Sequence, residues 1–302
     1  ILYRVTHSKE KKTSKIFVLL TKIKKKLYEL LLMVELQNKY KIGVRRFGLI
    51  NWVGAFNLYL KEVNRFFVVW AQTLLSPLVS SLLFLSVLTL ALGNDRGDVL
   101  GNSFINFLAP GLIIMSLIGQ SFSHSVSSFM ISKMQGNIVD TLYAPLSALE
   151  VSFAIILAAV TRSLVIAIIS IIVFSMIIDL SFFSIFYIIV FGFLSSFILG
   201  SLGFITGLWA EKFDHTATIT NFVITPLSFL SGVFYSIDKL PSVFKSISLF
   251  NPFFYMIDGF RYGFLGVSDG SIKFGLIYLT IISFVIWFIS FYLFKIGYKI
   301  KS

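Results

Sequence analysis

The sequence has 302 residues, of which 57% are hydrophobic and only 13% are charged, and its mean hydropathy is +0.89. Soluble domains carry about 25% charged residues, so this composition excludes an ordinary water-soluble protein. Apolar stretches of about 20 residues, each long enough for a helix to cross a bilayer, recur along the chain. Because lipid offers no partner to unpaired backbone groups, we expect an all-α polytopic membrane protein. The absence of cysteine excludes disulfide bonds, thiol catalysis and thiolate metal sites.

The net charge of +12 is concentrated at the amino end. Thirteen Lys and Arg residues stand against three acids between Arg4 and Arg46, whereas the rest of the chain carries thirteen basic and eleven acidic residues. A basic block beside a membrane segment is typical of the cytoplasmic side, and anionic lipid headgroups account for it at least as well as nucleic acid does. We therefore predict a basic cytoplasmic extension over residues 1–50, with membrane lipid rather than nucleic acid as its partner. Because the sequence starts at Ile1 rather than methionine, we expect this end to be incomplete or misassigned.

Six hydrophobic segments are long enough to form membrane spans. They cover residues 66–92, 104–129, 149–178, 184–209, 218–236 and 274–295. An even number of spans places both termini on one side of the membrane. Lysines near the carboxyl end match the basic amino end, so both termini are expected in the cytoplasm.

The segment in front of the first span has amphipathic spacing. Apolar side chains from Trp52 to Phe67 recur on one helical face, while Asn57, Lys61 and Arg65 fall on the other. This pattern is typical of a helix that lies in the membrane interface. We expect such a helix over residues 52–64, leading directly into the first span.

The cytoplasmic connection between spans two and three predicts a short helix. Within residues 133–150, Asn137 is a suitable N-cap, Ile138 and Leu142 follow at helical spacing, and Pro145 ends the pattern. A simple turn is the alternative. We expect one helix lying across the membrane plane.

The outward connection over residues 237–270 predicts two short helices. Asn251 before Pro252 places a capping side chain directly ahead of a proline at the first helical position. The residues that follow are too apolar for solvent, yet Asp258 and Arg261 are too polar for lipid. A re-entrant helical hairpin packed against protein resolves this conflict.

Several residues inside the spans attract interest. Arg162 falls within span three, where inserting a charge costs about 2.5–3.5 kcal/mol, so we expect it to face the bundle interior or the transport route. The alternative is that it snorkels to the interface or pairs with a neighbouring helix. In span four, Gly200, Gly203 and Gly207 have the spacing that lets two helices approach closely. The neighbour can belong to this chain or to a second copy. His124, among the serines of span two, is expected to be a hydrogen-bonded packing residue rather than a proton relay.

The search for catalytic chemistry finds neither the phosphate-binding loop G-x-x-x-x-G-K-[ST] nor the zinc helix H-E-x-x-H in the sequence. The three histidines are too far apart along the chain to suggest a common site. We therefore expect no bound cofactor, no metal and no enzymatic activity in this chain.

Three separated motifs resemble the bacterial type 2 ABC exporter permeases, the ABC-2 type membrane proteins. The run SGVFYSIDKLPSVFKSISLFNPFFYMIDGFRYGFLG at residues 231–266 looks like the family's signature. FMISKMQGNIVDTLYAPLS at residues 129–147 is similar to its segment between spans two and three, and LAPGLIIMS at residues 108–116 to its second span. The resemblance is strongest to the YadH-like subfamily, and it places an ABC type 2 transmembrane domain at residues 51–298.

The resemblance implies roles for three of the predicted helices. The amphipathic helix before span one would be a connecting helix. The helix between spans two and three would be a coupling helix that docks on a separate ATPase subunit through Asn137, Asp140, Leu142, Ala144 and Pro145. The re-entrant pair would form an outer gate that includes Asn251, Pro252, Arg261 and Tyr262.

The same resemblance implies an ATP-driven exporter in the bacterial inner membrane. Two permease copies, expected to be a homodimer, would assemble with two ATPase subunits that bind the ATP and Mg. The expected cargo is amphipathic, lipid-linked, polysaccharide or drug-like. A secondary transporter or a channel without an ATPase partner is the alternative.

Overall fold

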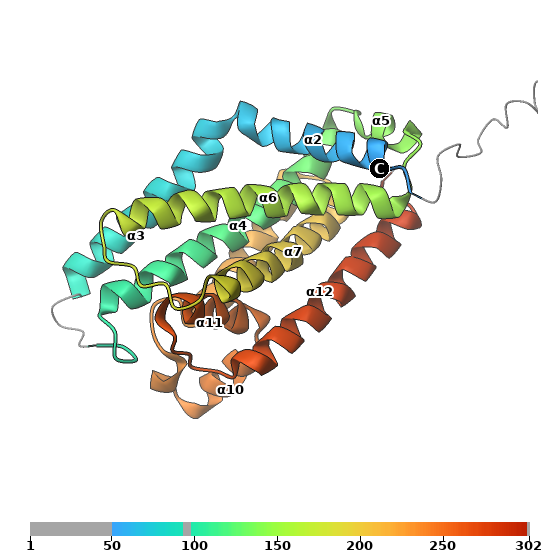
Figure 1. The fold of residues 1–302 in the computed structure, drawn as a ribbon. Coiled ribbons are helices and arrows are strands. Elements are labelled where there is room, and N and C mark those ends of the chain that lie inside the picture. Colours follow the sequence, from blue (N-terminus) through green and yellow to red (C-terminus); the bar gives the residue numbers. More distant parts are fainter. Residues whose placement is uncertain (1–49, 93–97, 301–302) are drawn as a thin grey trace, which may run out of the picture. The chain divides into compact units, whose positions relative to one another are not determined.

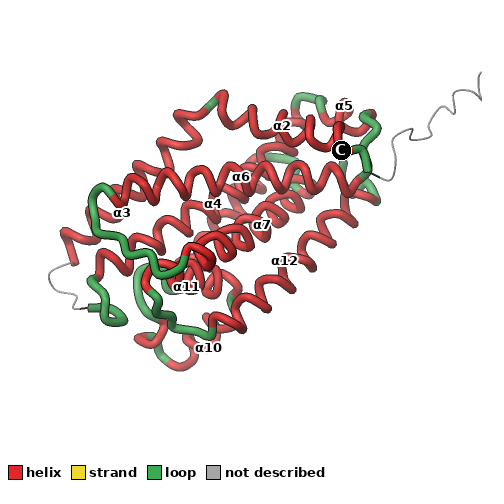
Figure 2. Tube along the Cα trace, viewed as in Figure 1, coloured by secondary structure: helices red, strands yellow, loops and turns green. Residues whose placement is uncertain are grey.

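The computed structural model describes residues 50–92 and 98–300, and its regular structure in those ranges is helical (Figure 2). The described residues contain no strand, only an isolated bridge between Val99 and Asn102. The basic extension predicted over residues 1–50 lies outside the described residues, apart from Ile50. The all-α prediction is confirmed for the part of the chain that is described.

The first two helices, α2 (Trp52–Val68) and α3 (Ser76–Leu92), are joined by a π-helical turn, Ala71–Leu75. Asn51 caps α2 by accepting a hydrogen bond from the amide of Gly54 at 2.9 Å. The predicted apolar face of α2 points outward, because Trp52 and Phe56 are exposed while Leu58, Glu62 and Phe66 are buried. An outward apolar face is what a helix in the membrane interface requires.

The centre of the bundle is formed by α4 (Phe104–Met134) and α7 (Ile185–Trp209), with α6 (Ala148–Ser175) beside them (Figure 1). Two thirds (67%) of the most apolar windows of α4 and α7 are buried inside the protein. The corresponding share is 11% for the span that contains α3 and 17% for α12 (Ile272–Lys295). The peripheral α3 and α12 therefore offer most of their apolar surface to lipid or to another subunit.

Five helices in the described residues are long and apolar enough to cross a membrane, which makes this a polytopic membrane protein. The segment predicted as a fifth of six spans, residues 218–236, is not among them. It is helical from Phe213 to Leu230, in three pieces: α8 (Phe213–Ile219), a π-helical turn (Thr220–Ile224) and α9 (Thr225–Leu230). Asp214, His215 and Asn221 make this stretch more polar than the other five.

Both short connections predicted to be helical are helical. The connection predicted to be cytoplasmic forms α5 (Ile138–Tyr143), and the connection predicted to face outward forms α10 (Ser242–Phe250) and α11 (Pro252–Leu265) after a short 3₁₀ turn, Ile237–Lys239. In Figure 1, α5 and the start of α2 lie at one end of the bundle, while α10 and α11 lie at the other. We call these the α5 end and the hairpin end.

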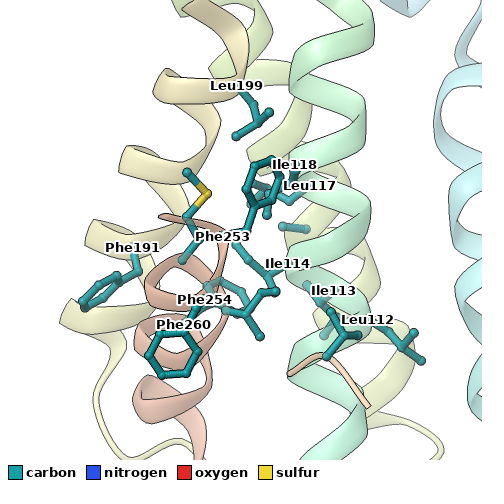
Figure 3. Close-up of a cluster of buried hydrophobic side chains, with 14 of the residues drawn as sticks. Leu112, Ile113, Ile114, Leu117, Ile118, Phe191, Leu199, Phe253, Phe254 and Phe260 are labelled. Carbon is teal, nitrogen blue, oxygen red and sulfur yellow. The ribbon is translucent and has the colours of Figure 1, made fainter. Parts of the chain in front are cut away.

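The main hydrophobic core lies where α11 enters the bundle between α4 and α7 (Figure 3). Phe253 and Phe254 of α11 belong to this core together with Ile114, Leu117 and Ile118 of α4. The ring of Phe260 lies on the other side of α11, toward Gly192 of α7. In lipid such side chains hold helices together through close van der Waals packing. The core therefore fixes α11 inside the protein.

Candidate functional site

The α5 end presents the residues predicted to couple to an ATPase. Asn137, Asp140, Leu142 and Pro145 are exposed and Ala144 is half-buried. Only Ile138 of α5 is buried, while Val139, Leu142 and Tyr143 are 46%, 43% and 86% exposed. The helix thus has one anchor in the protein and an apolar outer face.

Asn137 occupies the N-cap position of α5, as its side chain type predicts, but the capping bond itself is not made. Its amide Nδ2 instead donates to Oε1 of Gln135 at 3.1 Å. The helix is only six residues long and therefore depends on tertiary contacts for its stability.

A groove of about 320 Å³ separates α5 from α2, and both helices line it. Lys61 and Gly54 of α2 line this groove, together with Asp140 of α5 and Ala144, which follows α5. We call the groove together with the exposed face of α5 the α2–α5 surface.

Glu150 ties the α2–α5 surface to the bundle, a role that the sequence analysis missed. This buried carboxylate accepts from the Asn51 amide at 2.5 Å and from the Ser147 amide at 2.7 Å, while the Ser147 hydroxyl accepts from the Glu150 amide. Asn51 also donates through Nδ2 to the Pro145 carbonyl at 3.3 Å. One carboxylate therefore joins the starts of α2 and α6 to the end of the α5 connection.

The S-x-x-E pattern of Ser147 and Glu150 is the local signal that could have pointed to this residue, because it is the sequence form of a capping box. The structure has this capping box at the start of α6. The link to Asn51, 99 residues away, leaves no local trace in the sequence.

At the hairpin end, Asn251 and Arg261 both bind the segment that follows α9. The Asn251 side chain accepts from the Phe253 amide at 3.1 Å and donates to the Leu227 carbonyl and the Ser231 hydroxyl. Arg261 is fully buried and donates to the carbonyls of Gly232 at 2.8 Å and Val233 at 3.2 Å. The predicted gate residues therefore hold the hairpin onto the end of α9.

The other two predicted gate residues, Pro252 and Tyr262, are partly buried in contacts within the protein. Pro252 is the first residue of α11 and is half-buried. Tyr262 is half-buried, and its ring centroid lies 5.1 Å from that of Tyr187 and 5.4 Å from that of Phe183. These contacts place Tyr262 against the start of α7.

The connection from α11 to α12 is organised by a second carboxylate. Asp258 accepts from the amides of Asp269 at 2.9 Å and Gly270 at 3.0 Å.

Residues 266–270 read G-x-S-x-G, the letter pattern of a hydrolase nucleophile turn. No strand precedes Ser268 in the described chain and its hydroxyl donates to the Gly270 carbonyl, so these residues are a loop rather than a nucleophile site.

The three glycines of α7 that were predicted to pack against another helix, Gly200, Gly203 and Gly207, face α4 of the same chain. A Cβ at Gly200 would lie 3.2 Å from the Ser121 hydroxyl, and one at Gly207 would lie 2.8 Å from Cβ of Phe129. A Cβ at Gly203 would overlap the main-chain oxygen of Phe122. The spacing left open whether the helix packed against these glycines belongs to this chain or to a second copy. The structure shows that α4 of the same chain is such a helix.

A polar cluster lies between α2 and α4, at the level of His124. Glu62 is buried and accepts from the Ser128 hydroxyl at 2.9 Å, and its carboxylate is 3.1 Å from Arg65. His124 is fully buried, with Nε2 at 3.8 Å from Glu62 and no hydrogen-bond partner on either ring nitrogen among the described residues. The expectation that His124 is hydrogen-bonded is therefore wrong, because its nearest polar neighbour lies beyond hydrogen-bond distance.

Arg162 pairs with a neighbouring helix. Its Nη2 donates to Oε1 of Gln120 on α4 at 2.6 Å. The side chain is partly buried, and its Nε has no partner in the described part of the chain. Pairing with a neighbouring helix is one of the alternatives that the sequence left open for Arg162.

The α5 end also carries contacts between the ends of α4, α7 and α12. Lys133 donates to the carbonyls of Leu208 and Ala210 and so covers the end of α7. Lys299 donates to Glu211 at 2.9 Å, which lowers the pKa of the Glu211 carboxyl and raises the pKa of Lys299. This exposed pair is lost as pH falls through the lowered pKa of Glu211 or rises through the raised pKa of Lys299.

Together these features define a multi-pass helical membrane protein with the α2–α5 surface at one end and the largely buried helix α11 at the other. Its described residues contain no group of three or more metal-ligating side chains. Comparison with known proteins gives the family. Residues 55–265 match the family model of the ABC-2 type transporters.

The chain is also similar to curated relatives. It is 33% identical over 235 residues to the inner membrane transport permease YadH of Escherichia coli strain K12, covering 77% of this chain and 92% of the relative. It is 26% identical over 224 residues to nodulation protein J of Rhizobium leguminosarum bv. trifolii, covering 72% and 83%. The chain therefore belongs to the ABC-2 type transporter family and is a permease subunit, as its motifs predicted. This family model describes the membrane subunit, so ATP hydrolysis is not the activity of the residues that it matches.

Proposed function

We propose that this chain is the permease subunit of an ATP-driven exporter, which moves an amphipathic, lipid-linked, polysaccharide or drug-like substrate out across the bacterial inner membrane. The observation that carries the proposal is the α2–α5 surface, because an apolar face outside the membrane needs a protein partner. The partner that we propose is an ABC ATPase subunit, which membership of the ABC-2 family implies, and that subunit would bind the ATP and Mg.

Six spans fit the structure better than five. The helical stretch Phe213–Leu230 is about 27 Å long at 1.5 Å per residue, close to the roughly 30 Å of a bilayer core. Its two ends contact opposite ends of the bundle. The Ala210 carbonyl, just before it, accepts from Lys133 at the α5 end, and the Leu227 carbonyl accepts from Asn251 at the hairpin end.

With six spans both termini lie on the same side as α5. The basic residues near each terminus favour the cytoplasm, which is where an ATPase finds ATP. The α2–α5 surface then faces the ATPase, and the α10–α11 hairpin lies toward the outside of the cell.

The proposed mechanism is mechanical. Closure of an ATPase dimer would push on α5 through Asp140 and Leu142, and the Glu150 clamp would pass that movement to the starts of α2 and α6. Two permease copies, most simply a homodimer, would move as rigid bodies and switch the route between them from inward to outward access. The hairpin would close the outer end until that switch.

The test is recovery of an ATPase with the tagged permease, co-expressed with its genomic neighbours. Val139→Asp puts a charge into the exposed face of α5, and burial of a valine is worth about 1.5–3 kcal/mol. We expect this variant to recover about tenfold less ATPase, the change that about 1.4 kcal/mol produces. The measurement is the ratio of ATPase to permease, and ATP hydrolysis, in the purified sample.

The matched control is Val243→Asp, the same change at the second residue of α10, where the valine is 66% exposed at the hairpin end. It is expected to leave ATPase recovery unchanged. Equal losses in both variants, or a stable permease without any ATPase, would contradict the proposal and favour a secondary transporter.

A further inference from the structure

A polar stripe runs along the part of α4 that neighbouring helices of the chain leave uncovered. Ser116, Gln120, Ser123 and Ser127 follow one another at intervals of four, three and four residues, which places them on one helical face. Ser123 is exposed and the other three are half-buried, although α4 is among the most buried helices. The stripe is about 16 Å long, roughly half the thickness of the bilayer core.

Ser127 and Gln120 have hydrogen-bond partners within the chain, and the Ser116 hydroxyl is buried. The exposed Ser123 hydroxyl and the Gln120–Arg162 pair beside it are the groups that are unfavourable against lipid, because hydrocarbon does not solvate polar groups. Polar residues at membrane depth normally face a water-filled cavity or protein. The stripe is therefore expected to line the route between two permease copies.

Arg162 stands beside this stripe without a counter-charge. It lies at the midpoint of α6, about 20 Å from either end of that helix, so the headgroups of the surrounding bilayer do not provide one. Its hydrogen-bond partner Gln120 is neutral, and no carboxylate lies within 4.0 Å of it in the described chain. A buried charge without a partner is costly and is normally kept for a function.

The second arginine at the stripe is already neutralised. Arg65 lies within 3.5 Å of the Ser127 hydroxyl, but its guanidinium pairs with Glu62 at 3.1 Å. His124 adds a fully buried imidazole behind the same stripe. The described groups around the stripe therefore carry one cation in excess, and that cation is Arg162.

We propose that Arg162, oriented by Gln120, binds the anionic group of the cargo, so that the substrate class is an anionic amphiphile carrying a phosphate or a carboxylate. A guanidinium matches both groups by paired hydrogen bonds, and the unpartnered Nε of Arg162 is available for one of them. The hydroxyls of Ser123 and Ser127 would form hydrogen bonds with the anionic group as it moves along the route. This inference rests on the proposed exporter function and adds the charge of the cargo to it.

The test measures binding of amphiphiles to the full chain in phosphatidylcholine nanodiscs. The probes are radiolabelled dodecyl phosphate and dodecyltrimethylammonium, which share a chain and differ in charge, and empty nanodiscs give the background. We expect dodecyl phosphate to bind about tenfold tighter than the cation, the difference that one buried charge-assisted interaction produces. Arg162→Gln is expected to abolish this preference, and Arg162→Lys to keep most of it.

Lys273→Gln is the matched control, because it removes the same charge from an exposed position at the start of α12. It is expected to leave the preference unchanged. Ser123→Glu adds an anion at the exposed part of the stripe, which neutralises the one excess cation and is therefore expected to abolish the preference; this variant keeps the test valid if Arg162→Gln does not fold.

Equal binding of the two probes by the wild-type chain would overturn the inference, as would equal effects of Arg162→Gln and Lys273→Gln. The binding assay requires no ATPase, so its outcome is independent of the co-purification test. An ATPase that co-purifies with a permease lacking anion preference would overturn this inference alone.

Discussion

Replacing Gly203 by alanine is expected to lower the free energy of unfolding by about 1–3 kcal/mol, the usual cost of overpacking a core. The added Cβ would overlap the main-chain oxygen of Phe122 on α4. A main-chain oxygen cannot rotate away as a side chain can, so α4 and α7 would have to separate along their shared length. The measurement is the thermal unfolding temperature of the purified permease in detergent, together with its recovery as a monodisperse species.

Gly119→Ala is the control for this change, because a Cβ at Gly119 meets nothing within 4 Å in the chain. Alanine is favoured over glycine in a helix by about 1 kcal/mol, so this variant is expected to be as stable as the parent or slightly more. If Gly203→Ala unfolded at the same temperature as Gly119→Ala, the close packing of α4 on α7 would be refuted.

Replacing Arg261 by methionine is expected to release the hairpin from the end of α9. The change removes two charge-assisted hydrogen bonds to the carbonyls of Gly232 and Val233, each worth about 1.5–3 kcal/mol. It also removes the contact with the Phe107 ring, whose centroid lies 3.8 Å from the guanidinium carbon. We expect a destabilisation of about 3–5 kcal/mol, seen as a lower unfolding temperature and faster proteolysis of residues 232–250.

Arg261→Lys tests whether the positive charge alone is sufficient to hold the hairpin. Both hydrogen bonds come from Nη2 at the tip of Arg261. Lysine keeps the cation but is shorter and lacks the planar group that lies over the Phe107 ring, so an intermediate unfolding temperature is expected. A methionine variant that is as stable and as protease-resistant as the parent would show that Arg261 does not hold the hairpin.

The elements of this fold could be predicted where the signal is local. Length and apolarity were sufficient for the five long helices, and the Asn251-Pro252 pair correctly predicted the start of α11. The predicted end of a helix was wrong where a tertiary contact determines the end. Span two was predicted to end at residue 129, yet α4 continues to Met134 because Lys133 is held by carbonyls at the end of α7.

The candidate sites could be predicted less well, because they depend on partners far apart in the chain. Glu150 meets Asn51 across 99 residues, and Glu62 meets Ser128 across 66. The amphipathic pattern of α2 did not single out Glu62, which the structure buries against Ser128 of α4. For Arg162, the spacing located a charge in a span, but only the fold showed Gln120 as its partner.

The most direct test of the account is site-specific cross-linking between α5 and the ATPase. The sequence contains no cysteine, so L142C introduces a single thiol on the exposed face of α5, and V243C places a matched thiol at the hairpin end. In membranes from cells that co-express the neighbouring ATPase, a thiol-to-amine cross-linker is expected to join the ATPase to L142C and not to V243C. Failure of L142C to capture an ATPase, or equal capture by V243C, would contradict the assignment of this chain as an ATP-driven permease.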